Sequence, residues 1–264
     1  GPDHLRAVGD AVEPGGALMD AVNEFWTFVT TAENYWGQRG IAIRLWDHLR
    51  LAGFSVLVAS ALALPPAIWL GHRKRGGVVA VWLVNIGRAV PSFAIIVLIF
   101  PIALRYGLGL GFWPTAFALV LLGIPPIFTN AFTGVRDVDA GIVESARGMG
   151  MREREVLRSV EIPAALPLII TGLRVSAVQV VATATLGAYV GFGGLGAFIV
   201  EGFAIQDDGK LLTGAILVAL MSLVVELVFG WAQRRLTPWA QAGVLANRGT
   251  MVDATMMDVE TVPA

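Results

Sequence analysis

The sequence contains no cysteine, few charged residues and almost no net charge, and each of these shortages excludes a class of function. Without cysteine the chain has no disulfide bond, no thiol nucleophile and no cysteine-ligated metal. Its three histidines stand at no helical or metal-ligand spacing, so we expect no metal site. The net charge of -1 provides no basic surface, so we expect no nucleic-acid partner.

The sequence is rich in apolar residues. Charged residues make up 15% of the 264 residues, against about 25% in soluble domains, whereas 56% are hydrophobic. A helix that crosses a membrane needs about 20 apolar residues. Runs of this kind cover residues 49–70, 78–104, 112–135, 166–189 and 211–231. We therefore predict an all-α, polytopic membrane protein of about five transmembrane helices.

The second run leaves the number of crossings open. It is longer than one crossing needs and carries Arg88 and Pro91, so it is either one tilted, broken helix or two short ones. Five crossings place the basic residues of segments 72–75, 136–158 and 234–235 on one side, which the positive-inside rule assigns to the cytoplasm. A sixth crossing fits these charges less well. We predict an outside N-terminus and a cytoplasmic C-terminus.

The two ends of the chain differ from its middle. Residues 18–46 are amphipathic and contain Trp26, Trp36 and Trp46, a pattern typical of a helix that lies in the membrane interface. The alternative is an extended soluble cap. Residues 237–264 are polar, and we predict a disordered cytoplasmic tail. The expected division is an N-terminal extension over residues 1–47, a transmembrane domain over 48–236 and the tail.

One long charged segment, residues 144–163, interrupts the apolar runs. The pattern predicts a helix over residues 137–149, a turn at Gly150 and a second helix from Arg152. Glycine accepts the left-handed conformation that ends a helix. We expect Pro163 to stop the second helix, because proline lacks the N–H group that continues one.

This segment resembles the EAA loop of ATP-binding cassette (ABC) importer permeases, with the pattern Glu-Ala-Ala, three residues, Gly, nine residues, Ile-x-Leu-Pro. Serine replaces the first alanine, and valine and isoleucine replace the apolar pair. The matching positions, within an expected loop of residues 137–163, are Glu144, Ser145, Ala146, Gly150, Val160, Ile162 and Pro163.

The resemblance implies a MetI-like permease fold in the bacterial inner membrane and a cytoplasmic coupling helix formed by the loop. It also implies the partners: ABC ATPase subunits with a groove for that helix, a second permease subunit of the same or a sister chain, and an extracytoplasmic substrate-binding protein. ATP and Mg would be bound by the ATPase. This chain would hold no cofactor and would not be an enzyme.

A glycine-rich stretch over residues 187–196 spells the dinucleotide-binding fingerprint between Gly191 and Gly196. No strand precedes it, so we interpret it as a re-entrant turn where backbone passes close to a neighbour. Together with residues 88–92 and 48–51, the stretch resembles osmoprotectant importers for glycine betaine, carnitine and choline, over residues 45–236. The resemblance implies such a substrate.

Three alternatives stay open. Within the same class, the substrate is methionine or another amino acid. An ion-gradient-driven secondary transporter would usually carry inverted repeats and midplane acidic residues, and no repeat is visible here. A membrane enzyme would need a cluster of catalytic side chains, which the sequence does not suggest.

Polar residues within the runs are candidates for the translocation pathway, because they are costly in lipid. Their alternative role is hydrogen bonding between helices. We expect Arg88 either to pair with Glu226 or to repel cations from a closed gate. The candidates are Asn85, Arg88, Pro91, Ser92, Asn130, Gln179, Thr183 and Glu226.

Overall fold

The computed structural model describes residues 14–37, 39–74, 77–86 and 91–239, and the regular structure within these ranges is helical. The chain divides into two compact units. Unit 1 comprises Gly1–Ser55, Val90–Val120 and Gln179–Ser222, and unit 2 comprises Val56–Ala89, Leu121–Val178 and Leu223–Ala264. Of the expected tail over residues 237–264, residues 240–264 lie outside the described residues.

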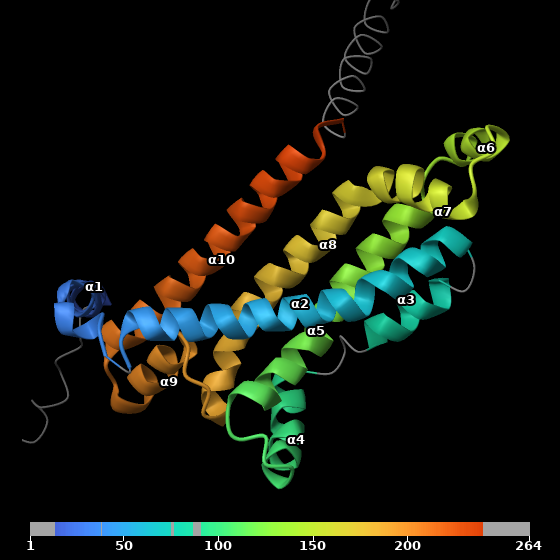
Figure 1. The fold of residues 1–264 in the computed structure, drawn as a ribbon. Coiled ribbons are helices and arrows are strands. Elements are labelled where there is room, and N and C mark those ends of the chain that lie inside the picture. The colour runs from blue at the N-terminus through green and yellow to red at the C-terminus, as the bar shows by residue number, and fades with distance from the viewer. Residues whose placement is uncertain (1–13, 38, 75–76, 87–90, 240–264) are drawn as a thin grey trace, which may run out of the picture. The chain divides into compact units, whose positions relative to one another are not determined.

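Four described helical segments are long and apolar enough to cross a membrane (Figure 1). They are α2 (Ile41–Arg73), α5 (Phe112–Arg136), the run Glu153–Val190 and α10 (Asp208–Leu236). Each passes from one unit into the other along the chain. The all-α membrane fold predicted from the apolar runs is therefore confirmed.

The second predicted run is divided in two. Helix α3 covers Gly77–Ile86 and α4 covers Ser92–Arg105, with Pro91 at the N-cap of α4. Proline fits there because its fixed φ suits a helix start and its missing N–H group would have no helical partner. Residues 87–90, including Arg88, lie outside the described residues.

The described part of the N-terminal segment contains one helix and a short turn before α2. Helix α1 spans Pro14–Thr30, a 3₁₀ turn (η2) spans Ala32–Asn34, and α2 already begins at Ile41. Residues 41–46 therefore belong to the first long helix, and the expected domain boundary at residues 47–48 falls inside it. Trp26, Trp36 and Trp46 are all exposed, as an interfacial role requires.

Small residues bring the helices of unit 2 close together. A Cβ atom on Gly172 of α8 (Ile162–Thr183) would lie 2.8 Å from the Pro126 carbonyl oxygen of α5. The Ser176 hydroxyl donates to the Gly123 carbonyl at 3.1 Å, which joins the same two helices. Close backbone approach through glycine and interhelical hydroxyl bonds are typical of membrane helix packing.

In unit 1 the glycine-rich stretch forms a turn between a 3₁₀ helix (η5, Ala184–Val190) and α9 (Gly196–Ile205). Gly191 and Gly194 have φ values of +82° and +63°, which favour glycine. The turn is anchored by the buried side chain of His48, whose Nδ1 accepts from the Leu195 N–H at 3.2 Å and whose Nε2 lies 2.9 Å from the Val181 carbonyl oxygen. These close contacts match the prediction of a tight turn.

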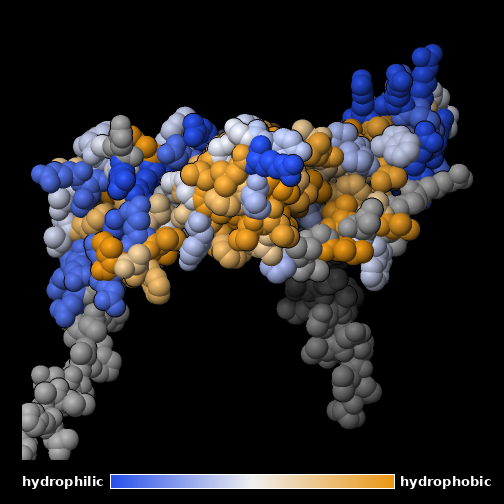
Figure 2. All heavy atoms as spheres, turned by 90° about the horizontal axis from the view of Figure 1, so that it is seen from below, coloured by the Kyte–Doolittle hydropathy of each residue, from blue (hydrophilic) through white to orange (hydrophobic). Residues whose placement is uncertain are grey.

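Many side chains on the face drawn in Figure 2 are apolar. Helix α10 contributes a run of side chains that are each more than half exposed: Leu220, Leu223, Val224, Leu227, Val228 and Trp231. A surface of this kind is typical of a face that contacts lipid or another protein.

Candidate functional site

The charged loop begins with a short helix in unit 2. Helix α6 spans Ala140–Gly148, and its N-cap residue Asp139 accepts from the Ile142 N–H at 3.1 Å. An aspartate at this position satisfies one of the free N–H groups of the first turn. The cap explains why the helix begins at Ala140 rather than at residue 137.

The predicted turn at Gly150 is confirmed, with φ at +88°. The Gly150 N–H donates to the Arg147 carbonyl at 2.9 Å, and the Met151 N–H donates to the Ala146 carbonyl at 3.2 Å. These two bonds form a Schellman motif, in which a left-handed residue satisfies the last carbonyl groups of a helix.

The predicted stop at Pro163 is wrong. Helix α7 covers Glu153–Val156, a π-helical stretch covers Leu157–Glu161, and α8 begins at Ile162. Pro163 is thus the second residue of α8 and lies inside a continuous helical run over Glu153–Val190. The π-helical stretch changes the hydrogen-bond register just before the proline ring, which lets the helical run continue.

A small apolar core holds the two halves of the loop together. Val143 and Ala146 of α6 contact Val156 of α7 and Val138, and Met151 and Val160 pack against this cluster. Of the predicted coupling residues, Ala146 is buried and Val160, Ile162 and Pro163 are half-buried. Glu144 and Ser145 are exposed on the other side of α6, beside Gly148 and Met149.

Two carboxylates, those of Glu161 and Glu153, fasten this loop to His72 at the end of α2. The Nδ1 atom of His72 lies 2.5 Å from Oε2 of Glu161, and its Nε2 atom lies 3.4 Å from Glu153. Arg147 of α6 donates to Glu153 at 3.0 Å. The hydrogen bond to Glu153 raises the pKa of Arg147, which keeps the guanidinium charged.

Sequence reasoning did not single out Glu161, although it is fully buried. It occupies the variable position between Val160 and Ile162, so the motif gives no signal for it. The available signal was a carboxylate among apolar residues and a histidine at the end of a predicted span. Buried carboxylates need a partner, and His72 supplies one.

Glu226, a predicted pathway residue, is paired with Arg174 of α8. The Arg174 Nε atom donates to Oε2 at 2.7 Å, and a second guanidinium nitrogen contacts the other oxygen. Both side chains are half-buried. Sequence reasoning expected Arg88 as the partner and overlooked Arg174, which lies within a predicted run. The pair fits a structural link between α8 and α10.

The other pathway candidates are spread over both units. Asn85 of α3 and Asn130 of α5 belong to unit 2, and the Asn130 amide donates to the Pro126 carbonyl of its own helix at 2.8 Å. Unit 1 contains Pro91, Ser92, Gln179 and Thr183. Apart from Pro91, which is exposed, these candidates are half-buried, which fits either role considered for them.

Most of the sequence, including this loop, matches a known family. Residues 55–241 match the family described as "Binding-protein-dependent transport system inner membrane component". The chain belongs to this family. It is therefore a multi-pass membrane permease subunit of the ABC transporter class.

Curated relatives agree with this assignment. The chain is 39% identical over 200 residues to a carnitine transport permease protein of Listeria monocytogenes, covering 76% of this chain and 89% of that protein. It is 33% identical to a choline transport system permease protein of Bacillus subtilis, with 74% and 88% covered. An osmoprotectant import permease protein of Salmonella typhimurium is 32% identical, with 77% and 82% covered.

Solved structures share the fold. The methionine ABC transporter MetNI, in an inward-facing conformation, contains a chain with a TM-score of 0.66 and 22% identity, covering 75% of this chain and 96% of that one. An amino acid ABC transporter solved with histidines has a TM-score of 0.60 and 20% identity, with 83% and 97% covered. The MetI-like permease fold expected for this permease is confirmed.

Proposed function

We propose that this permease forms the translocation pathway for a small osmoprotectant such as glycine betaine, choline or carnitine. The observation that carries the proposal is the similarity of most of the chain to permeases named for these substrates. A substrate of the methionine or amino-acid type is the second candidate, favoured only by the fold likeness to MetNI.

ATP hydrolysis takes place in separate ATPase subunits, and α6 is the coupling helix that contacts them. The exposed face of α6 supports this role, because Ser145 and Gly148 leave room for a partner and Glu144 offers a carboxylate for a basic side chain. Met149, 78% exposed, provides an adaptable apolar contact. Val160, Ile162 and Pro163 join the coupling helix to α8.

The chain would work with a second permease subunit and an extracytoplasmic binding protein. The coupling loop and the C-terminus face the cytoplasm, and the N-terminus lies outside. Residues 1–47 form an N-terminal extension, residues 48–236 form the permease domain and residues 237–264 form a tail. The pathway candidates remain Asn85, Arg88, Pro91, Ser92, Asn130, Gln179, Thr183 and Glu226.

A paired co-purification and uptake experiment tests this proposal. The permease is co-expressed with its ATPase and binding protein in cells that lack other osmoprotectant importers. Met149→Glu is compared with Leu108→Glu, a matched change at a half-exposed residue outside the coupling loop. We expect Met149→Glu to lose the ATPase and uptake, and Leu108→Glu to keep both.

A panel of labelled substrates tests the substrate assignment separately from the ATP-driven transport mechanism. Labelled glycine betaine, choline, carnitine and methionine are supplied one at a time. Uptake of methionine alone would replace the osmoprotectant assignment while leaving the importer class intact. Uptake that persists without the ATPase would contradict the importer mechanism and favour a gradient-driven transporter.

A further inference from the structure

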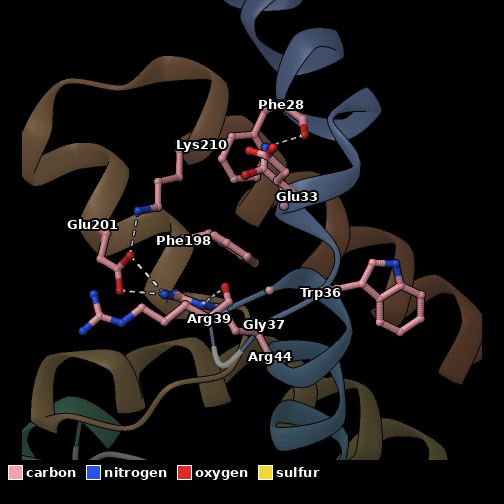
Figure 3. A pocket seen from close by; sticks show the side chains of 11 residues that line it. Phe28, Glu33, Trp36, Gly37, Arg39, Arg44, Phe198, Glu201 and Lys210 are labelled. Carbon is pink, nitrogen blue, oxygen red and sulfur yellow. Dashed lines mark hydrogen bonds and ion pairs between the residues drawn. The ribbon is translucent and has the colours of Figure 1, made fainter.

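Unit 1 contains a pocket of about 360 Å³ that no part of the coupling mechanism uses (Figure 3). Its walls come from α1, the segment around η2, the start of α2, α9 and the start of α10. Three aromatic side chains line it: Phe28, Trp36 and Phe198. Phe28 and Phe198 meet edge to face, with ring centroids 5.8 Å apart.

A charged cluster forms one wall of this pocket. Glu201 of α9 accepts hydrogen bonds from Arg44 at 2.8 and 3.0 Å and is 2.7 Å from the Lys210 ammonium (Figure 3). One carboxylate thus serves two cations. The other ionisable side chains of the lining are Arg39 and Glu33. The lining therefore has three cations and two carboxylates, which is a net charge of +1.

Arg44 is the buried member of the cluster. It is 5% exposed, and its guanidinium lies over the Phe198 ring at 4.3 Å from the centroid. Its Nε donates to the Arg39 carbonyl at 3.1 Å. Its buried Nη1 atom makes no hydrogen bond to any residue that the structure describes. A buried donor of this kind is costly.

We propose that this pocket binds a small zwitterion that carries both a carboxylate and a quaternary ammonium group. The carboxylate meets the surplus positive charge at the exposed Arg39. The ammonium meets Trp36 and Phe28, whose ring faces attract cations, because Arg44 already covers the face of Phe198. A simple anion would leave the rings without a role, and a simple cation would meet a wall of net positive charge. The inference rests on the proposed function, because it names a site on the permease for the same substrates.

This site would give the permease its own contact with substrate, in addition to the binding protein. In the predicted topology of five crossings, the segment from Glu201 to Lys210 lies between the last two runs, on the side opposite the basic segments, where substrate arrives. A substrate molecule released by the binding protein would meet the pocket before the membrane-spanning segments.

Direct binding measurements test the inference. The permease is purified with its ATPase in lipid nanodiscs, without the binding protein, and titrated calorimetrically with glycine betaine, carnitine and choline. We expect saturable binding of the two zwitterions and weaker binding of choline. Trp36→Ala is expected to weaken betaine binding by about two- to fivefold, the range of one cation–π contact at an exposed site.

Two further variants test whether the loss of binding is specific to the pocket. Trp46→Ala removes another exposed tryptophan that does not line the pocket, and is expected to leave binding unchanged. Arg39→Gln is expected to weaken betaine binding and to reduce its advantage over choline. Because Trp36 and Arg39 are exposed, neither change threatens the fold.

The outcomes separate this inference from the proposed function. Absence of saturable betaine binding, or an equal loss in Trp36→Ala and Trp46→Ala, would overturn the pocket even where uptake in cells stays normal. Another outcome is that a variant binds betaine normally in the titration but takes up less substrate in cells that contain the binding protein. That result would show that these residues form a docking surface for the binding protein and not a substrate pocket. Pocket-dependent betaine binding supports the inference whatever the cellular uptake assay shows.

Discussion

Replacing His72 with alanine should destabilise unit 2 strongly, because it leaves the carboxylate of Glu161 buried without a partner. Glu161 is fully buried, and its Oε2 atom is 2.5 Å from the imidazole. Its other oxygen, Oε1, has no hydrogen-bond partner among the described residues. Breaking a buried pair by removing one partner typically costs about 3–5 kcal/mol. For a chain of this size, that corresponds to a fall in melting temperature of roughly 6–20 °C.

A double mutant separates the unpaired carboxylate from lost packing. His72→Ala combined with Glu161→Leu removes both groups, and an apolar replacement of a buried pair is often neutral. We therefore expect the double mutant to melt well above His72→Ala alone. Arg73→Ala, at the exposed neighbouring residue, provides the matched control and should shift melting little.

The assay is thermal unfolding of the detergent-extracted permease, followed by intrinsic tryptophan fluorescence at constant protein and detergent concentration. The reasoning fails if His72→Ala melts within about 2 °C of the unmodified protein. It also fails if the double mutant melts no higher than His72→Ala. The cost would then come from the lost packing of the histidine and not from the unpaired carboxylate.

Three further predictions concern other parts of the chain. Gly150→Ala should cost about 1–2 kcal/mol of stability through its positive φ alone, because a Cβ there meets no atom within 4 Å. Gly148→Ala in the preceding helix should be neutral or stabilising. Thermal melting distinguishes the two variants. Arg174→Ala should lower the melting temperature more than Arg174→Ala with Glu226→Ala, because the single change leaves a half-buried carboxylate unpaired. Burial alone would raise the pKa of Glu201, but the hydrogen bonds from Lys210 and Arg44 outweigh it and lower the pKa. The stability that this carboxylate contributes is present above its unfolded pKa, near 4.3, and is lost as the pH falls through its lower pKa in the folded protein. The difference in melting temperature between the unmodified protein and Glu201→Gln should therefore shrink between about pH 5 and pH 3.

Local features of the sequence predicted the loop and the spans well. The turn at Gly150 follows from one residue type and its neighbours, and the apolar runs follow from composition over about 20 residues. Pro91 marks the start of α4 because proline restricts only its own surroundings. In each case the decisive interaction lies within a few residues along the chain.

Features that depend on distant contacts could not be read from the sequence. Arg44 and Glu201 are separated by 157 residues, and Arg174 and Glu226 by 52. Charge alone did not distinguish Arg174 from Arg88 as the partner of Glu226. The continuation of the helical run through Pro163 depends on a change of hydrogen-bond register that proline statistics do not foresee.

The contacts of the loop explain how a push on the proposed coupling helix would reach the membrane-spanning segments. Helix α6 shares its apolar core with α7 and Val160, so it cannot shift without moving the start of the run that becomes α8. At that junction Glu161 is bound to His72 at the end of α2. Two long helices therefore receive the displacement at one buried contact, between His72 and Glu161. Weakening this pair should reduce transport more than ATPase binding, because the exposed face of α6 stays intact.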